Sequence, residues 1–396
     1  MKRKHTQCRE SLIAICILLF GLLGCSMQGL FAQQLASMRL DGAMTTAAVS
    51  LDGHLVAINL AHSVQSANGS WESTESVEVL ELASSRVVSK IEIPSAALLK
   101  NAPLSSTDAF VSYCGKGKYL VAYDLIGSLY VFDAQTYQVE SKIELGSLPR
   151  VGVIGKRTMS CSADGGLIAV NAHGGQLGPG LVRVFDLASG QQIAELRANP
   201  SESEFTSISV SPNGSRLAVL VTDPGGNRTS GPNVEIRETK AMKLLSSFST
   251  GDVPRGMIFA GESEIVTVQQ QPTRSSSRQV LRLWDITSGK ELKTFSDAHV
   301  GVDWPISASS DGNTILGYIP TYRECRFCNG LEGRREIKEQ RFALWNKTTG
   351  TEIYRSEPFG PIVDPLGPRC VLNQSGASVM VYWPDNVITP RLFPVP

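Results

Sequence analysis

The sequence has no excess of charge of either sign. Its 37 Lys and Arg residues are balanced by 37 Asp and Glu residues. Proteins that bind nucleic acid through its phosphates carry a basic patch or stripe. The densest charge cluster of this chain, residues 323–341, instead mixes Arg and Lys with Glu. We therefore expect no nucleic-acid partner.

Histidine and the motifs of common active sites are scarce or missing. Downstream of residue 25 the chain holds four His, none of which belongs to a pair at metal-ligand spacing: His54, His62, His173 and His299. The chain also has no nucleophile elbow and no glycine-rich phosphate loop. We therefore expect no catalytic residue, no metal site and no cofactor.

Long hydrophobic runs are missing as well, apart from residues 12–23. This run follows the basic residues 2–4 and is too short to cross the ~30 Å hydrocarbon core of a bilayer as a helix. A basic segment followed by a short apolar one is typical of an export signal. We therefore expect residues 1–25 to be a signal peptide and the remainder of the chain to be exported.

The end of this segment, Leu22-Leu23-Gly24-Cys25, resembles a bacterial lipobox. The resemblance implies that Cys25 is the lipidated N-terminus of the mature chain, and that the protein is anchored in the periplasm or cell envelope. Membrane contact would then occur only through this lipid anchor. Cleavage after Ser26 or Ala32 is the alternative, and it would give a free secreted protein.

What the chain does contain is a repeated segment in which an alternating apolar run is followed by polar turn residues. Alternation indicates a half-buried strand, and the Asp, Ser, Thr and Gly that follow it indicate a turn. Copies recur at intervals of 47 to 61 residues, which is the mark of stacked or radial repeats. The fifth positions of the six copies are Glu81, Asp133, Asp186, Glu238, Asp285 and Asn346.

A second series of tight turns lies between the first, and each turn separates two apolar runs. Glycine in these turns supplies the positive φ that short hairpins need. Residues 261–263 occupy the equivalent place in the fifth unit. The two series of turns together predict seven units, each with two hairpin turns and about four strands. The turn glycines are Gly53, Gly117, Gly165, Gly214, Gly312 and Gly376.

The strands of the first series end in Phe132-Asp133, Phe185-Asp186, Trp284-Asp285 and Trp345-Asn346, and Ser-Gly or Thr-Gly follows the last three. On these residues the chain resembles a WD-repeat or related YVTN-type β-propeller, although the Gly-His dipeptide of the WD family is missing. The resemblance implies an all-β domain over residues 34–396, built as a seven-bladed β-propeller of four-stranded antiparallel blades. Its aromatic residues are expected to pack between neighbouring blades.

The seventh unit holds strand candidates for only three strands. We therefore expect residues 34–40 to pair with it as its fourth strand, because a strand supplied from the N-terminal side closes the ring and protects its edges. The alternative is a six-bladed ring with an extra hairpin.

Five Cys follow Cys25, so at least one of them is unpaired. We interpret Cys325 and Cys328 as a loop disulfide, because no further zinc ligands lie near them in the sequence. Cys114 and Cys161 fall on the innermost strands of adjacent units, and we interpret them as small buried thiols.

A four-stranded antiparallel blade places both of its hairpin turns on one face, here called the turn face. The loops between second and third strands, and the connections between blades, lie on the other face, here called the long-loop face. Elaborated loops on a rigid scaffold are where binding sites usually lie. All of the long segments fall on this second face: residues 62–74, 174–180, 223–232, 271–278 and 320–340.

The connections between blades are expected to surround the mouth of the central channel on the long-loop face. Arginine presents a fork of donors and tryptophan a flat apolar surface, so such a ring could bind a polar or anionic ligand. The structural alternative is that these residues set the entry angle of each inner strand and pair across neighbouring blades. The candidate binding residues are Arg150, Arg255, Asp303, Trp304 and Asp364.

The sequence thus favours a non-catalytic, monomeric, exported propeller that acts as a protein-interaction scaffold at the cell envelope, with a protein partner that remains unidentified. The alternative is an enzyme with its active site at the channel mouth, such as a lactonase or a metal-dependent hydrolase. Fold resemblance alone does not decide between the two.

Overall fold

The structure is a computed structural model of the 396-residue chain. It describes residues 43–65, 71–84, 86–93, 110–123, 128–145, 159–163, 165–171, 180–198, 204–222, 233–251, 254, 256–272, 277–295, 307–324, 335–358, 369–373, 375–382 and 391–395. These residues form antiparallel sheets in which strands that are neighbours in sequence are neighbours in space. The described part of the chain is therefore all-β.

Six of the sheets have four strands each, and we number them blade 1 to blade 6 in chain order. Blade 1 contains β1 (Ala43–Val49), β2 (Leu55–Gln65), β3 (Trp71–Glu81) and β4 (Arg86–Ile93). Blade 2 contains β5 (Phe110–Cys114), β6 (Tyr119–Tyr123), β7 (Ser128–Asp133) and β8 (Val139–Glu144). Blade 3 contains β9 (Met159–Cys161), β10 (Leu167–Asn171), β11 (Leu181–Asp186) and β12 (Gln192–Arg197).

The second half of the chain continues the same arrangement. Blade 4 contains β13 (Glu204–Val210), β14 (Arg216–Thr222), β15 (Val234–Glu238) and β16 (Leu244–Phe248). Blade 5 contains β17 (Gly256–Phe259), β18 (Glu264–Pro272), β19 (Ser277–Asp285) and β20 (Glu291–Phe295). Blade 6 contains β21 (Ser307–Ala308), β22 (Thr314–Glu324), β23 (Arg335–Asn346) and β24 (Glu352–Arg355). A smaller C-terminal sheet contains β25 (Arg369–Leu372), β26 (Ser378–Tyr382) and β27 (Arg391–Pro394).

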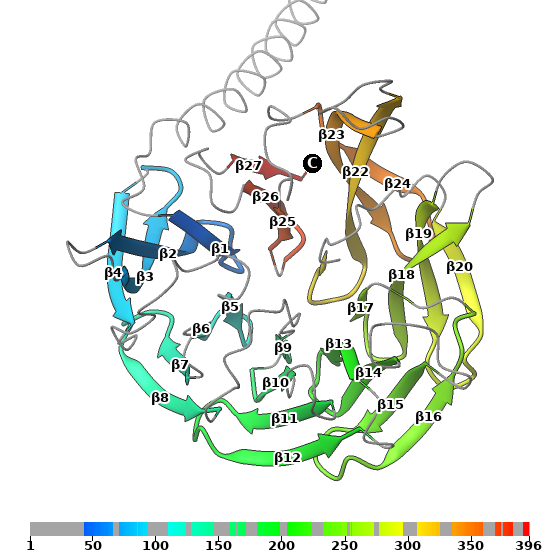
Figure 1. Ribbon diagram of the computed structural model, residues 1–396, viewed down its shortest axis with the longest axis horizontal. Coiled ribbons are helices and arrows are strands. Elements are labelled where there is room, and N and C mark those ends of the chain that lie inside the picture. The colour runs from blue at the N-terminus through cyan, green and yellow to red at the C-terminus, as the bar shows by residue number, and fades with distance from the viewer. Residues whose placement is uncertain are drawn as a thin grey trace, which may run out of the picture.

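The sheets are arranged radially around a central axis, as in a β-propeller (Figure 1). The first strand of each four-stranded blade lies nearest the axis, and the fourth strand lies at the circumference. The C-terminal sheet stands between blade 6 and blade 1, because β25 contacts β1 as well as β21 and β22. The side-chain amide of Asn373 also donates to Leu51 O at 3.1 Å, which ties this sheet to the inner turn of blade 1.

The prediction of seven four-stranded blades is wrong: the described residues form six four-stranded blades and a C-terminal sheet of three strands. The seven units were counted from their hairpin turns, and the C-terminal sheet has such turns too. The spacing of turns does not, however, show how many strands pair in each sheet. The six-bladed alternative has the right number of four-stranded blades, although the extra element is a sheet rather than a hairpin. Residues 34–40, predicted as a fourth strand of the last blade, lie outside the described residues.

Every four-stranded blade has a register irregularity at the same place, between its third and fourth strands. In blade 5 the shift falls between Leu283 and Trp284, and in blade 6 between Leu344 and Trp345. The equivalent shifts in the other blades lie at Val79/Leu80, Val131/Phe132, Val184/Phe185 and Ile236/Arg237. A bulge of this kind increases local twist, and its recurrence marks the blades as copies of one unit.

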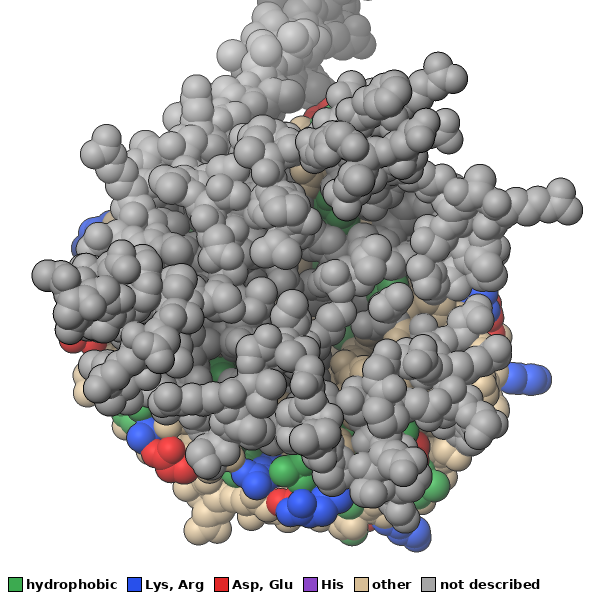
Figure 2. Space-filling view, in the orientation of Figure 1, with side chains coloured by type: hydrophobic (Ala, Val, Ile, Leu, Met, Phe, Trp, Pro, Cys, Tyr) green, Lys and Arg blue, Asp and Glu red, His purple; other side chains and the backbone are tan. Residues whose placement is uncertain are grey.

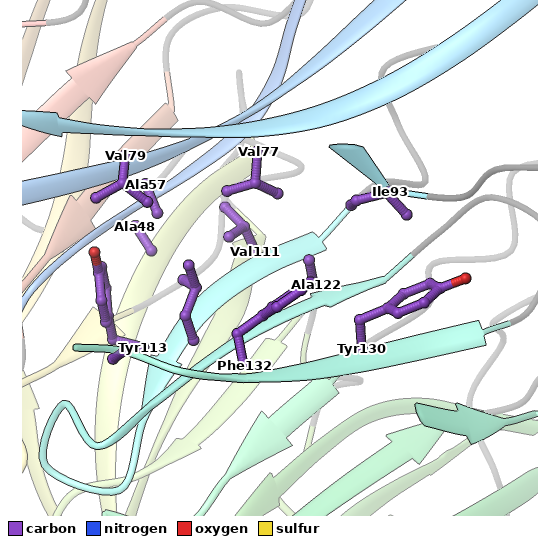
Figure 3. Close-up of a cluster of buried hydrophobic side chains, with 12 residues drawn as sticks. Ala48, Ala57, Val77, Val79, Ile93, Val111, Tyr113, Ala122, Tyr130 and Phe132 are labelled. Atoms are coloured by element: carbon purple, nitrogen blue, oxygen red, sulfur yellow. The ribbon is translucent and has the colours of Figure 1, made fainter. Parts of the chain in front are cut away.

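The hydrophobic core is divided into clusters, and each cluster fills the space between adjacent sheets. Figure 3 shows the cluster between blades 1 and 2, in which Ala57 and Val79 of blade 1 face Val111 and Phe132 of blade 2. Burial of this kind contributes roughly 25 cal/mol per Å² of apolar surface removed from water. Because each sheet is apolar on both faces, each one depends on its two neighbours for stability.

The aromatic residues of the repeat lie between blades, as predicted. Phe185 of blade 3 packs among residues of blade 2, Trp284 of blade 5 among residues of blade 4, and Trp345 of blade 6 among residues of blade 5. The Trp284 ring lies 5.9 Å from the ring of Phe248 in blade 4, and its Nε1 donates to Thr267 Oγ1 at 2.9 Å.

A disulfide joins Cys114, at the end of β5, to Cys161, at the end of β9, with 5.9 Å between the two Cα atoms. The interpretation of these residues as buried thiols is therefore wrong. Innermost strands of adjacent blades converge toward the axis, which brings the two Cα atoms within the range that a disulfide requires. Cys370 of β25 is a free, buried cysteine.

Candidate functional site

The turn face carries both hairpin turns of every blade, and the two turns of a blade are hydrogen-bonded to each other. In blade 3 the Leu187 amide donates to Gly166 O, and in blade 5 the Ile286 amide donates to Ser263 O, both at 3.1 Å. The predicted placement of the tight turns on one face is confirmed. Equivalent bonds run from Leu82 to His54, Ala134 to Lys118, Thr239 to Ser215, Lys347 to Asn313 and Val395 to Ala377.

The outer turns explain the Asp, Ser and Thr of the sequence repeat. Asp285 Oδ1 accepts hydrogen bonds from the amide and the hydroxyl of Ser288, both at 2.7 Å. These bonds stabilise the carboxylate and lower the pKa of Asp285. The same two bonds, from the residue three positions on, are accepted by Asp133, Asp186 and Asn346.

The inner turns are held by a serine at the end of the innermost strand. In blade 6 the Ser309 hydroxyl accepts from the Thr314 amide at 3.0 Å and donates to Asp311 Oδ1 at 2.5 Å. Burial by itself raises the pKa of Asp311, but the hydrogen bonds from Ser309 and Asn313 outweigh it and the pKa is lowered. Ser50, Ser162 and Ser211 accept the equivalent amide bond in blades 1, 3 and 4.

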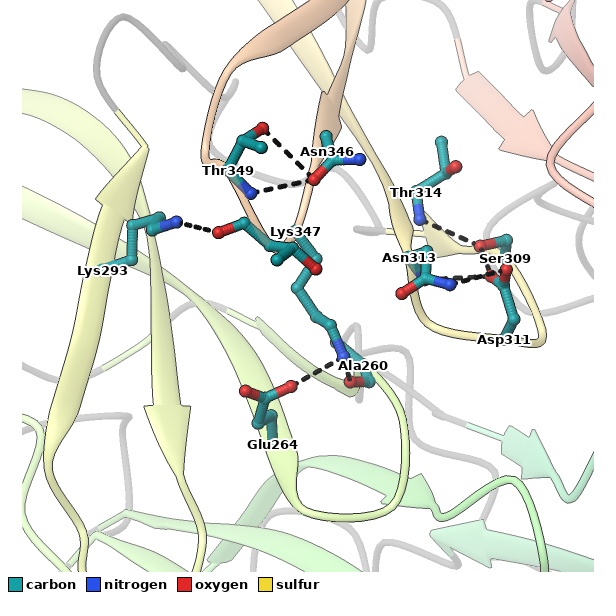
Figure 4. Close-up of polar contacts among 11 residues, drawn as sticks. Ala260, Glu264, Lys293, Ser309, Asp311, Asn313, Thr314, Asn346, Lys347 and Thr349 are labelled. Carbon is teal, nitrogen blue, oxygen red and sulfur yellow. Dashed lines mark hydrogen bonds and ion pairs between the residues drawn. The ribbon is translucent and has the colours of Figure 1, made fainter.

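Blade 5 has Ala260 in place of this serine, and residues of the adjacent blades support its inner turn instead. The Lys347 ammonium of blade 6 donates to Ala260 O at 2.8 Å and lies 2.7 Å from Glu264 Oε2 (Figure 4). On the other side, Arg216 Nη1 of blade 4 donates to Glu262 O at 2.7 Å. Serine, aspartate, lysine and arginine side chains of the turn face are thus used to hold the turns.

The long-loop face is built differently, because in the described residues three blades have long second and third strands that run toward this side. Their second and third strands run for 9 to 12 residues, whereas those of blades 2 and 3 run for 5 or 6. Segments predicted as loops in blades 1, 5 and 6 are in large part projecting β-hairpins: β2 with β3, β18 with β19, and β22 with β23. The three blades occupy one continuous sector, with the C-terminal sheet between blade 6 and blade 1 (Figure 1).

Charged side chains of the described residues also gather at the circumference. Figure 2 shows them along the rim, over the outer strands β8, β12 and β16. Lys142 and Glu144 form an ion pair at 2.5 Å on β8, and Arg197 and Glu195 form one at 2.7 Å on β12. Exposed pairs of this kind contribute little to stability, about 0 to 1 kcal/mol each. Mixed charge on edge strands does discourage pairing with other chains.

The residues predicted at the channel mouth, Arg150, Arg255, Asp303, Trp304 and Asp364, all lie outside the described residues, as do Cys25, Cys325 and Cys328. The structure does place the inner strands that follow them in sequence. β9, β17, β21 and β25 all begin at the long-loop end of the axis, since each one ends at a turn on the opposite face. Convergence of the predicted side chains on one point remains a prediction.

A polar network that the sequence analysis missed lies at the long-loop end of blades 4 and 5. Asn233 Oδ1 accepts from the Thr250 amide at 3.0 Å, and Gln269 Nε2 donates to Thr250 O at 3.0 Å. All three residues are buried. They anchor the start of the connection that leads from β16 to β17. The sequence does contain a signal for this network, because polar residues such as Gln269 come directly after an apolar strand run that includes Val266 and Val268.

One contact between a serine and a histidine bears on catalysis. Ser76 Oγ lies 3.5 Å from His62 Nε2 across strands β3 and β2. Ser76 is only 3% exposed, and the contact joins two paired strands within blade 1. Among the described residues, no three His, Cys, Asp or Glu side chains are grouped so that they could hold a metal ion.

Comparison of the chain with protein-family models and with curated proteins gave no match. In the part of the chain that the structure describes, no helix has the length and apolar character needed to cross a membrane.

Proposed function

We propose that this protein is a non-catalytic, exported β-propeller that binds a protein partner through its long-loop face and acts as a scaffold at the cell envelope. The observation that carries the proposal is the difference between the two faces. The turns of one face are short and hydrogen-bonded within themselves, and the other face bears projecting hairpins from blades 1, 5 and 6. Function in repeat scaffolds commonly lies on the elaborated face.

The Cys114–Cys161 disulfide supports export, because disulfides persist in oxidising compartments and are rare in the cytosol. The basic and apolar segments of residues 1–25 support the same conclusion. We propose that Cys25 is lipidated and tethers the propeller to a membrane, with secretion as a free protein as the alternative. Mass spectrometry of the mature N-terminus distinguishes an acylated Cys25 from an unmodified later residue.

We also propose that the blades are divergent WD-type or YVTN-type repeats. The support is the recurring combination of a bulge before the aromatic residue, an Asp or Asn at the strand end, and a Ser or Thr three positions later. An enzyme with a channel-mouth active site is the second candidate, and no described contact favours it over the scaffold.

An affinity scan tests the assignment of the binding face. The exported chain is used to capture a partner from envelope extract, and purified partner is then titrated against Arg255→Ala and Trp304→Ala. Because Trp and Arg dominate many interfaces, each is expected to weaken binding about 30-fold, which corresponds to ~2 kcal/mol. Asp52→Asn and Asp311→Asn are the matched controls on the turn face, since Asn213 already makes the equivalent turn bonds in blade 4. Loss confined to the two controls would reverse the assignment.

A further inference from the structure

Hydroxyl groups join the innermost strands of adjacent blades at two junctions. Between blades 3 and 4, the Val210 amide donates to Ser160 Oγ at 2.9 Å. Between blades 4 and 5, the Phe259 amide donates to Ser209 Oγ at 2.9 Å. Donor and acceptor are 50 residues apart in both cases, so both bonds follow the repeat.

These bonds supply acceptors to backbone amides on the innermost strand of a blade, which is an edge strand of its sheet. The first strand of each blade pairs with the second on one side only, so its outward amides have no partner within the blade. A buried amide without a partner costs roughly 1 to 3 kcal/mol. A serine on the preceding blade supplies the missing acceptor and also links the two blades.

The junction between blades 2 and 3 has a disulfide in this place. Cys161 takes the repeat position of Val210 and Phe259, and Ser112 takes that of Ser160 and Ser209. The Ser112 hydroxyl, however, donates to Tyr113 O of its own strand at 3.2 Å. The cross-link comes instead from Cys114, which stands where blades 1, 3, 4 and 6 have the serine that holds the inner turn.

The backbones at this junction are also in close contact. A Cβ atom placed on Gly165 would lie 2.3 Å from the Cα atom of Gly115, so the inner turns of blades 2 and 3 touch directly. Cys114 is fully buried and Cys161 is partly exposed. Solvent therefore reaches residue Cys161 but not residue Cys114.

We propose that the Cys114–Cys161 disulfide is a redox-dependent cross-link that fixes the innermost strands of blades 2 and 3 to each other once the chain meets an oxidising compartment. Farther from the axis, Ser141 Oγ donates to Leu187 O and Arg183 Nη1 donates to Leu145 O in both redox states. At the innermost strands, however, the reduced junction has neither the covalent bond nor the serine bond, so its inner end is held only by packing. In the oxidised protein the same inner end is held by a covalent bond. The proposal does not depend on the identity of any binding partner.

Closure requires a disulfide oxidant, either a low-molecular-weight disulfide or a thiol oxidoreductase. The Cys161 thiolate attacks this disulfide, forms a mixed disulfide and releases one oxidant thiolate. The Cys114 thiolate then attacks Cys161 Sγ and releases the second, so two protons and two electrons leave the protein for each bond formed. Reduction follows the reverse path and begins at the accessible Cys161.

The test compares thermal unfolding of the full chain before and after treatment with a dithiol reductant under native conditions. Alkylation and mass spectrometry establish the state of Cys114 and Cys161 in each sample. We expect reduction to lower Tm by about 5 °C or more, from the usual effect of losing a native disulfide. We also expect hydrogen exchange of β9 to rise, while that of β17 stays unchanged.

The double variant Cys114→Ser/Cys161→Val is the matched control, because it copies Ser211 and Val210 of blade 4. It retains Cys325 and Cys328, so any effect of the reductant on their predicted disulfide appears in both proteins. The Tm shift of about 5 °C or more should be missing from the double variant, because that shift comes from the Cys114–Cys161 bond. Burial raises the pKa of the Cys370 thiol, which keeps that residue protonated and unreactive. Equal Tm values for verified oxidised and reduced protein would overturn the proposal. So would free thiols at Cys114 and Cys161 in protein from the exported fraction, or a Tm shift of the same size in the double variant.

Discussion

The junction between blades 2 and 3 and the junction between blades 4 and 5 meet the same structural need with different chemistry. Blades 2 and 3 are joined by the Cys114–Cys161 disulfide, and blades 4 and 5 by the bond from the Phe259 amide to Ser209 Oγ. Both links start near the end of one innermost strand and reach the next. Cys161 and Phe259 occupy the same repeat position, whereas Cys114 lies two positions beyond the equivalent of Ser209. The two links therefore share one end, and the group that meets it from the preceding blade differs.

The inner turns also differ in whether they are held by their own blade or by the adjacent blades. The inner turn of blade 6 is held by its own Ser309, whereas that of blade 5 is held by Lys347 and Arg216 of the adjacent blades. A propeller whose blades hold one another in this way should unfold as a unit. Predictions about individual junctions can then be read from the stability of the whole.

Removal of the largest aromatic residue should have the largest effect on the junction of blades 4 and 5. Trp284→Ala leaves a cavity against Phe248 and should lower the free energy of unfolding by about 3 to 5 kcal/mol in denaturant titrations. Trp284→Phe is the control, because it retains a smaller ring at this site and loses the bond to Thr267 with only part of the packing, for a lower cost of about 1 to 3 kcal/mol. A loss below ~1 kcal/mol for the alanine variant would contradict the placement of Trp284 between the blades.

The serine bond itself should have an intermediate effect. Ser209→Ala leaves the Phe259 amide buried without its acceptor and should cost about 1 to 3 kcal/mol. Ser112→Ala, at the junction that the disulfide holds, removes a bond only within its own strand and should cost less than ~1 kcal/mol. Chemical denaturation of both variants under oxidising conditions gives the two values. Equal losses would mean that the two junctions do not differ in their dependence on serine.

The smallest effect is expected in the outer turns, as a dependence of Tm on pH. The pKa of Asp285 is lowered in the folded protein, so the stabilisation is present above the ordinary pKa of about 4 and is lost as the pH falls through the folded value. Asp285→Asn should remove this pH dependence, because the amide does not titrate. It should leave Tm at pH 7 almost unchanged, since Asn346 makes the same bonds in blade 6. A variant whose Tm between pH 5 and pH 2.5 falls as steeply as that of the wild type would argue against a role for this turn.

The local features of the blades could be predicted because each depends on residues that are close in the sequence. Alternating apolar residues before Asp186 or Asp285 form a strand whatever lies beside it, and Ser189 or Ser288 then closes the turn. The assignment of both turns to one face followed from strand direction alone. The candidate binding residues, by contrast, were inferred from their position between blades, and Arg255 and Trp304 lie outside the described residues.

By itself, the sequence determined the repeat, the strands and turns within it, and the burial of Phe185, Trp284 and Trp345 between blades. Only the tertiary structure decided that six sheets have four strands, that blades 1, 5 and 6 project as hairpins, and that Cys114 pairs with Cys161. The physical reason is the range of the interactions. Strand periodicity and turn bonds act over a few residues, whereas a disulfide that spans 47 residues depends on how adjacent blades converge at the axis.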